Sequence, residues 1–237
     1  MSSPPTAPEA VKLADRLARI RERCAAALAR RGPGPVPRLI GVSKRHPLAA
    51  ILEARAAGLE DFGENYAQEF RDKAAALENN PPRWHFIGAL QRNKVKHVVG
   101  KALIHTVDRS SLLEAIEARA AREELVQEVL VEVNLGGEAQ KAGVSEADLP
   151  ALLDHFAGTP HVRCIGLMLI PPPAPPEVTR GFFARLRALR ERLADDLRLG
   201  VDLQHLSMGM SSDFEVAIEE GATLLRVGTA IFGPRPY

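Results

Sequence analysis

The sequence alternates between short apolar runs and longer amphipathic segments, and this alternation limits the folds open to it. Eight runs have the length and composition of buried strands: Arg38–Ser43, Leu59–Gly63, Trp84–Leu90, Leu103–Val107, Val129–Asn134, Arg163–Ile170, Leu203–Met208 and Thr223–Gly228. Helical segments separate most of them, the clearest carrying Phe182, Leu186, Leu189, Leu193 and Leu197 at steps of three or four residues. Eight strands joined mainly by helices predict an α/β fold, a single (β/α)8 TIM barrel.

One domain accounts for nearly the whole chain. Residues 1–8 are rich in Pro and Ser, and we expect a disordered tail there. An extra N-terminal helix is predicted from about Glu9 to Arg30, ended by GPGPVP at 32–37, so that residues 9–237 form one barrel domain. A doubly wound open sheet would show the same alternation with fewer strands. No GxGxxG follows the first strand, however, which weakens a dinucleotide-binding alternative.

Charge and motif content exclude several functional classes. Thirty-one Lys and Arg against thirty Asp and Glu give a net charge of +1, unlike the basic excess of a nucleic-acid binder. No apolar run approaches the roughly 18 residues of a membrane span, and the N-terminus lacks a secretory signal. Two cysteines form no disulfide framework, and the seven histidines show no metal-ligand spacing. We therefore expect a cytoplasmic protein with no metal and no nucleic-acid or membrane partner.

Chemistry in a parallel barrel lies at the carboxyl ends of the strands, and Lys44 directly follows the first one. Burial there lowers the pKa of a lysine, so that a neutral amine can attack a carbonyl and form a Schiff base. Only seven lysines occur in the chain, and only Lys44 has this position. The alternative is a surface lysine that starts a loop, because Arg45 beside it shows that the turn is not dry on all sides.

The last two strands are followed by turns of small residues that could hold a phosphate. Gly209, Ser211 and Ser212 lead into a helix capped near Ser212 or Asp213, and Gly228 with Thr229 begins a final helical turn. Helix N-termini offer unpaired amides to anions, although ordinary capping by Ser and Thr explains the same residues.

Three further features can be interpreted from the sequence. Arg226 shares a strand face with Gly228, so it points either toward the phosphate or into an ion pair with a barrel carboxylate. Residues 91–94, QRNK, are read as a solvated turn, and His85 as a core histidine with its polar atoms satisfied.

Several segments together resemble a known family. GVSKRHP, DFGENYAQE, WHFIGALQRNK, VEVNLGGEAQKAGV, GLM, and SMGMSSD followed by RVGTAIFG occur in the order and spacing of the YggS/PROSC family of pyridoxal 5'-phosphate (PLP) homeostasis proteins. The resemblance covers residues 9 to 237. This family is similar to the N-terminal barrel of alanine racemase and of eukaryotic ornithine decarboxylase.

The resemblance implies PLP as the cofactor and a role for several residues. Lys44 matches the lysine that holds PLP as an aldimine, and Asn65 matches an asparagine near the cofactor. Ser211, Gly228 and Thr229 match the phosphate-binding set, and Arg226 matches the arginine facing the pyridine nitrogen in the related racemase. Met210 and Ser207 line the same loop. Where the family pattern leads us to expect a threonine after GLM, this chain has Leu169, which puts one polar contact in doubt.

The residues favour a cofactor holder over an enzyme. An arginine at the ring nitrogen keeps it unprotonated, which makes the ring a poorer electron sink. A racemase also needs an acid/base on each substrate face, and Lys44 supplies one. In the racemase relatives a C-terminal β-domain brings the other; this chain stops nine residues after Gly228, and neither Tyr66 nor Tyr237 is obviously placed for the role.

We therefore expect storage and delivery of PLP by a monomer, with apo PLP-dependent enzymes as candidate acceptors. The alternatives are a low-activity amino-acid racemase or related PLP enzyme, and a PLP-free barrel aldolase whose Lys44 attacks a phosphosugar.

Overall fold

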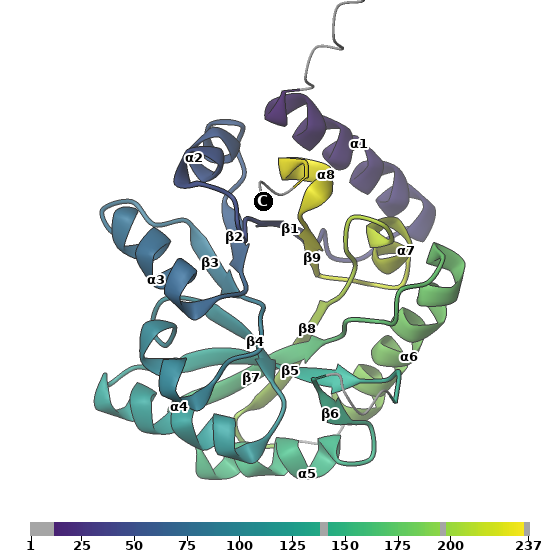
Figure 1. Cartoon of the computed structure of the whole chain (residues 1–237). Helices are drawn as coiled ribbons and strands as arrows, with labels where there is room; N and C mark the ends of the chain where they lie inside the picture. The colour runs from purple at the N-terminus through teal and green to yellow at the C-terminus, as the bar shows by residue number, and fades with distance from the viewer. Residues whose placement is uncertain (1–11, 138–141, 195–197, 235–237) are drawn as a thin grey trace, which may run out of the picture.

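The computed structural model describes residues 12–137, 142–194 and 198–234, and the predicted strands form a closed parallel barrel (Figure 1). The barrel strands are β1 Arg38–Val42, β2 Asp61–Glu64, β3 Arg83–Phe86, β4 Leu103–Val107, β5 Gln127–Asn134, β7 Val162–Met168, β8 Val201–Ser207 and β9 Leu224–Val227. They neighbour one another in chain order, and β4–β5 and β1–β9 pairings complete the ring. The (β/α)8 prediction is confirmed, and ring closure excludes the doubly wound sheet. A two-residue strand, β6 Val144–Ser145, adds to β5 outside the ring.

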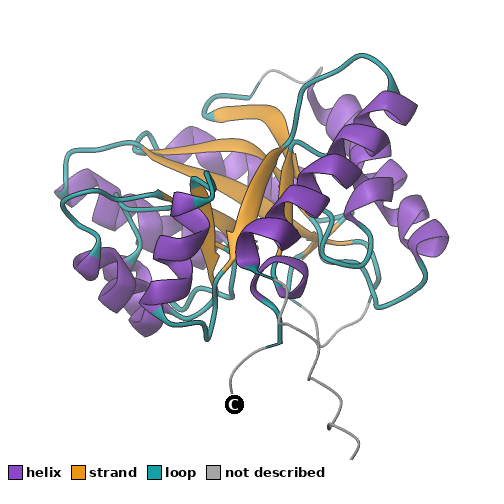
Figure 2. Cartoon of the chain, turned by 90° about the horizontal axis from the view of Figure 1, so that it is seen from above, coloured by secondary structure: helices purple, strands orange, loops and turns teal. Residues whose placement is uncertain are grey.

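Helices surround the strands, as Figures 1 and 2 show from two directions. They are α1 Leu13–Arg31, α2 Leu48–Ala56, α3 Ala67–Ala76, η1 Arg92–His97, α4 Ser110–Arg122, α5 Leu149–Asp154, η2 His155–Gly158, α6 Pro176–Ala194, α7 Phe214–Glu219 and α8 Thr229–Phe232. The predicted extra helix is confirmed as α1, which ends where Gly32 takes a φ of 81°. The predicted tail, residues 1–8, lies outside the described residues. No helix in the described ranges is long and apolar enough to cross a membrane.

Helix α1 buries one face against the last elements of the chain. Leu13, Leu17, Ile20 and Ala27 make up its buried side. The Arg16 Nε donates to the Ile231 carbonyl at 2.6 Å, which ties α1 to α8. Ion pairs of α1 arginines with Glu215 (2.7 Å) and Glu219 (2.6 Å) tie it to α7. The helix therefore supports the two elements that follow the carboxyl ends of β8 and β9.

The apolar core has two parts, as a barrel requires. A large cluster fills the space between the strands and the helices. A smaller cluster lies inside the barrel and consists of Ile40, Leu130, Ile165, Met168 and Leu224. Polar side chains share this interior, among them buried His85, His105, Ser207 and Arg226.

Candidate cofactor site

Lys44 lies in the turn after β1, at the carboxyl end of the barrel, and its side chain is half-buried. The backbone is held on both sides of it. The Ser43 N–H donates to the Gly63 carbonyl at 3.0 Å, and the Arg45 N–H donates to Glu69 Oε1 at 2.6 Å. Arg45 takes a φ of 62°, in the left-handed region that non-glycine residues seldom occupy, so these contacts hold a strained turn. The backbone of the turn that carries Lys44 is therefore held in place by hydrogen bonds.

A second lysine, Lys73 on α3, is buried next to this turn. Its ammonium donates to the Ser43 carbonyl at 2.8 Å, to Glu64 Oε1 at 2.6 Å and to Glu69 Oε1 at 2.7 Å. The Ser43 hydroxyl also donates to Glu64 Oε1, at 2.6 Å. Burial raises the pKa of the Glu64 carboxyl and outweighs the opposing effect of Lys73. All three ammonium protons are used, so Lys73 fastens the Lys44 turn.

Asn65 follows β2, the strand next to β1, and carries a polar atom that the protein leaves unpaired. Its Oδ1 is buried and accepts no hydrogen bond from any described residue. The turn after β3 presses against it, because a Cβ on Gly88 would lie 2.1 Å from the Asn65 carbonyl oxygen. An unpaired buried acceptor costs about 1–3 kcal/mol. This oxygen is therefore suited to a bound group that brings a donor.

The turns after β8 and β9 contact each other through Ser211. Its hydroxyl oxygen accepts from the Gly228 N–H at 3.3 Å and from the Ala230 N–H at 3.4 Å. Thr229 begins α8 with an exposed side chain, as the sequence predicted for a final helical turn. These two long hydrogen bonds hold the turn after β8 next to the turn after β9. Hydroxyl and amide groups of both turns therefore lie together at the carboxyl end of the barrel.

Asp213 orders the first of these turns. Its carboxylate accepts from the Met210 N–H at 2.7 Å, and α7 begins at the next residue, Phe214. Of the two predicted capping positions, Ser212 and Asp213, the structure selects Asp213. Burial raises the pKa of the Asp213 carboxyl. Met210 is half-buried in the same turn.

Arg226 extends from β9 into the barrel interior and is 4% exposed. One guanidinium nitrogen donates to Ser207 Oγ at 2.6 Å, and the other donates to the Leu169 carbonyl at 2.9 Å. Leu169 therefore supplies a polar contact through its backbone, although its side chain is apolar. Within the described residues Arg226 forms no direct ion pair, and the carboxyl groups of Glu132 and Asp213 act on its charge at longer range. Burial lowers its pKa to about 10, which still leaves it charged at neutral pH.

A chain of hydrogen bonds continues from Ser207 through the barrel interior. His105 Nδ1 lies 2.9 Å from Ser207 Oγ, and His105 Nε2 lies 2.9 Å from His85 Nδ1. His85 Nε2 lies 3.0 Å from the Asp61 carboxylate. The expectation that His85 is a satisfied core histidine is confirmed, since it is 2% exposed and both ring nitrogens have partners.

The donors in this chain can be assigned from its ends. Burial would raise the pKa of Asp61, but hydrogen bonds from His85 and Arg83 hold it at about 2, so Asp61 is an acceptor. Burial lowers the pKa of both histidines, which are therefore neutral. His85 then donates to Asp61, His105 donates to His85, and Ser207 donates to His105. Each hydrogen bond of the chain then has one donor and one acceptor. The Ser207 oxygen can still accept a hydrogen bond from Arg226.

The barrel brings most of the predicted residues together. Strands β2, β1, β9 and β8 are consecutive neighbours in the ring. The carboxyl ends of these four strands, or the turns that follow them, carry Asn65, Lys44, Arg226, Gly228, Thr229, Met210 and Ser211. Residues 91–94 were predicted to form a solvated turn. Residues 91–93 are exposed at the start of η1, as that prediction requires. In the described part of the chain, no group of three or more His, Cys, Asp or Glu residues could hold a metal.

Sequence reasoning missed some functional neighbours of the site. Lys73 follows Glu69 by four residues on a helix, which is the spacing of a surface ion pair. His105 and Glu132 each interrupt an apolar strand, and that interruption was a usable signal. Glu132 is 7% exposed, and burial, reinforced by Asp108, raises its pKa to about 7.

Comparison with known proteins identifies the family of this chain. The family described as alanine racemase, N-terminal domain, matches residues 16–236. A pyridoxal phosphate homeostasis protein of Aquifex aeolicus is 48% identical over 226 residues, covering 94% of this chain and 98% of that protein. A pyridoxal phosphate homeostasis protein of Pseudomonas aeruginosa is 46% identical over 222 residues, covering 93% of each. The chain belongs to the family of pyridoxal phosphate homeostasis proteins.

Solved structures share the fold of this chain. PipY of Synechococcus elongatus, solved with PLP bound, is 38% identical with a TM-score of 0.81, over 94% of this chain and all of that one. Alanine racemase of Corynebacterium glutamicum, at 15% identity and a TM-score of 0.62, shares the barrel over 61% of its own length. That second likeness concerns the fold alone.

Proposed function

We propose that this chain binds PLP at the carboxyl ends of β1, β2, β8 and β9 and takes part in cytoplasmic PLP homeostasis by storing and delivering it. The observation that carries the proposal is the convergence of Lys44, the contacting Ser211 and Gly228 turns, and buried Arg226 on four adjacent strands. Asn65 supports the fit, because its buried Oδ1 lacks a donor among the described residues. The PLP-bound PipY structure, at 38% identity, supports the identity of the ligand.

Each residue has a role set by its chemistry. PLP supplies an aldehyde that condenses with an amine and a conjugated ring that accepts electrons. Lys44 would provide that amine as a Schiff base, from a turn that Lys73 and Glu69 hold in place. Ser211, Gly228 and Thr229 would hold the phosphate with hydroxyl and amide groups, and Met210 would border it.

The same residues favour holding the cofactor over using it. Arg226 keeps its own charge at neutral pH, so it does not stabilise a proton on a ring nitrogen that it faces. Tyr66, a candidate second acid/base, is 46% exposed and engaged by Arg45, whose Nη2 donates to its hydroxyl at 3.3 Å. Tyr237 lies outside the described residues. We therefore assign no catalytic residue.

The absorption spectrum of the purified protein tests the lysine. We expect a visible band from the Schiff base that disappears in Lys44→Ala, and borohydride reduction should fix the label on the peptide containing Lys44. Lys96→Ala is the matched control, because Lys96 is exposed on η1. An unchanged band in Lys44→Ala, or label on another lysine, would overturn the assignment.

Incubation with L-alanine and other amino acids in D₂O separates the holder from an enzyme. Steady Cα deuterium incorporation that Lys44→Ala abolishes would favour a racemase or related PLP enzyme. Protein from PLP-replete cells that carries no chromophore would favour an aldolase that takes a phosphosugar.

Delivery and oligomeric state need separate measurements. We expect loaded protein to activate an apo PLP-dependent enzyme in the presence of a phosphatase that destroys free PLP. No activation under the phosphatase would show that transfer goes only through free solution. We also propose a monomer, which light scattering should confirm by a mass near 25.7 kDa.

A further inference from the structure

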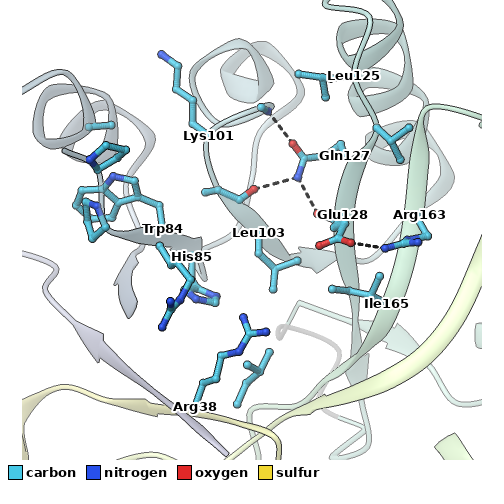
Figure 3. A pocket seen from close by; sticks show the side chains of 18 of the residues that line it. Arg38, Trp84, His85, Lys101, Leu103, Leu125, Gln127, Glu128, Arg163 and Ile165 are labelled. Atoms are coloured by element: carbon cyan, nitrogen blue, oxygen red, sulfur yellow. Dashed lines mark hydrogen bonds and ion pairs between the residues drawn. The ribbon is translucent and has the colours of Figure 1, made fainter. Parts of the chain in front are cut away.

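The amino-terminal end of the barrel, opposite the Lys44 turn, contains a cavity of about 960 Å³ (Figure 3). It is lined by the first residues of several barrel strands, including Arg38, Leu103, Gln127 and Leu224. Its size lies at the upper end of the range for small-molecule sites, about 300–1,000 Å³. None of the residues assigned to PLP lines it.

The cavity holds an arginine that the protein does not neutralise. In Figure 3 the Arg38 guanidinium points into the cavity, toward its centre. Arg38 forms no ion pair or side-chain hydrogen bond with any described residue. The other arginines of the lining are engaged: Arg163 pairs with Glu128, and Arg83 pairs with Asp61 at 2.8 Å. The Arg38 guanidinium is exposed to the cavity and has no anionic partner among the described residues.

The surrounding groups also offer apolar surface. Trp84 is 5% exposed, and its Nε1 is buried. His85 and His205 line the cavity, and burial together with the nearby Arg38 charge lowers the pKa of both. Leu103 and Ile165 contribute apolar side chains near Arg38 (Figure 3). A ligand complementary to this lining carries one negative group and an apolar body.

We propose that this cavity is a second binding site, for a small organic oxyanion whose carboxylate or phosphate pairs with Arg38 and whose body packs on Leu103 and Ile165. A guanidinium binds either oxyanion with two parallel hydrogen bonds, so both belong to the same recognition chemistry. The site is separate from the proposed PLP site and does not depend on it.

Trp84 is the only tryptophan of the chain and lines the cavity, so its fluorescence reports occupancy. The probes are benzoate and phenyl phosphate, with inorganic phosphate and neutral benzamide as comparisons. We expect a saturable change with benzoate or phenyl phosphate, weaker binding of inorganic phosphate, which lacks the apolar body, and none of benzamide. The tighter of the two aromatic anions identifies the natural head group as carboxylate or phosphate.

Arg38→Gln should weaken binding by about tenfold or more, the effect of losing a charge-assisted pair. Arg19→Gln, an exposed arginine on α1, is the matched control and should bind as wild type does. Lys44→Ala should also bind normally, which separates failure of this site from failure of the PLP assignment. Both Arg variants should keep the wild-type melting temperature. Arg38 is exposed to the cavity, and its side chain forms no hydrogen bond or ion pair with a described residue. No saturable signal with either aromatic anion, or equal affinity in Arg38→Gln, would overturn the proposal.

Discussion

His105 on β4 and Ser207 on β8 meet inside the barrel with Nδ1 2.9 Å from Oγ, although 102 residues separate them in the sequence. A hydroxyl has one proton and two lone pairs, so donation to His105 leaves the Ser207 oxygen free to accept from Arg226. The position of a buried arginine is therefore set partly by a histidine that does not contact it.

The first prediction concerns the charge state of this histidine. Burial holds the pKa of His105 well below 6.5 in the folded protein, so unfolded chains bind its proton first as the pH falls. The stability contributed by neutral His105 is present above pH 6.5 and is lost below it, by about 1.4 kcal/mol per pH unit. The free energy of unfolding in urea should be measured between pH 6.5 and 5. Plotted against pH, it should have a slope that is smaller in His105→Asn than in wild type by about that amount. His155→Asn, at the surface, controls for removing a histidine, and identical slopes in His105→Asn and wild type would contradict the prediction.

Glu132 should have the opposite dependence. Its pKa is raised from 4.5 to about 7, so between these pH values the unfolded chain is ionised while the folded protein keeps the proton, and stability falls as the pH rises from 4.5 to 7. Glu132→Gln removes that ionisation and should stabilise the protein at pH 8 by about 3 kcal/mol more than at pH 4.5. Denaturant unfolding at both pH values measures the difference. A variant equally stable relative to wild type at both pH values would show that folding does not raise the pKa of Glu132.

Lys73→Met tests the fastening of the Lys44 turn. It leaves the buried Glu64 carboxylate without its cation, which costs about 3–5 kcal/mol when a buried pair is broken. The double variant Lys73→Met with Glu64→Gln should recover much of that loss, because the carboxylate that then lacks its cation, Glu69, is partly exposed. Lys96→Met, on the surface, should change stability by less than about 0.5 kcal/mol. A single variant as stable as this control would refute the role of Lys73.

Two glycine-to-alanine changes should act in opposite directions. At Gly88 the new Cβ would lie 2.1 Å from the Asn65 carbonyl oxygen, so the Asn65 turn must move and stability must fall. At Gly181, inside α6, nothing lies within 4 Å, and alanine should stabilise the helix by about 1 kcal/mol. Thermal unfolding of both variants checks the signs. In the PLP-loaded protein, Gly88→Ala should also weaken cofactor retention, whereas Gly181→Ala should not.

Much of the fold could be predicted because the strands are local signals. Each barrel strand is an apolar run bounded by turn residues, and eight such runs admit few closed arrangements. β6 was missed because two residues are too short to show any periodicity. The end of α1 lies one residue beyond the predicted Arg30, at Arg31, since the last turn depends on capping geometry.

Site residues were predictable only where they directly follow a predicted strand in the sequence. Lys44 and the Gly228 turn follow strands directly, so the barrel rule places them. Lys73 and His105 act through partners on other strands or helices, and no sequence spacing records those contacts. Leu169 shows the same limit: its side chain argued against a polar contact, whereas its carbonyl makes one.

Helix α1 has a consequence for synthesis of the chain. It is made before α7 and α8, against which it packs, and its Arg16 meets Ile231 across 215 residues. A nascent chain therefore leaves much of the apolar side of α1 uncovered until β9 and α8 have left the ribosome. Contacts of such separation form slowly, so closure of the barrel is a late step in folding.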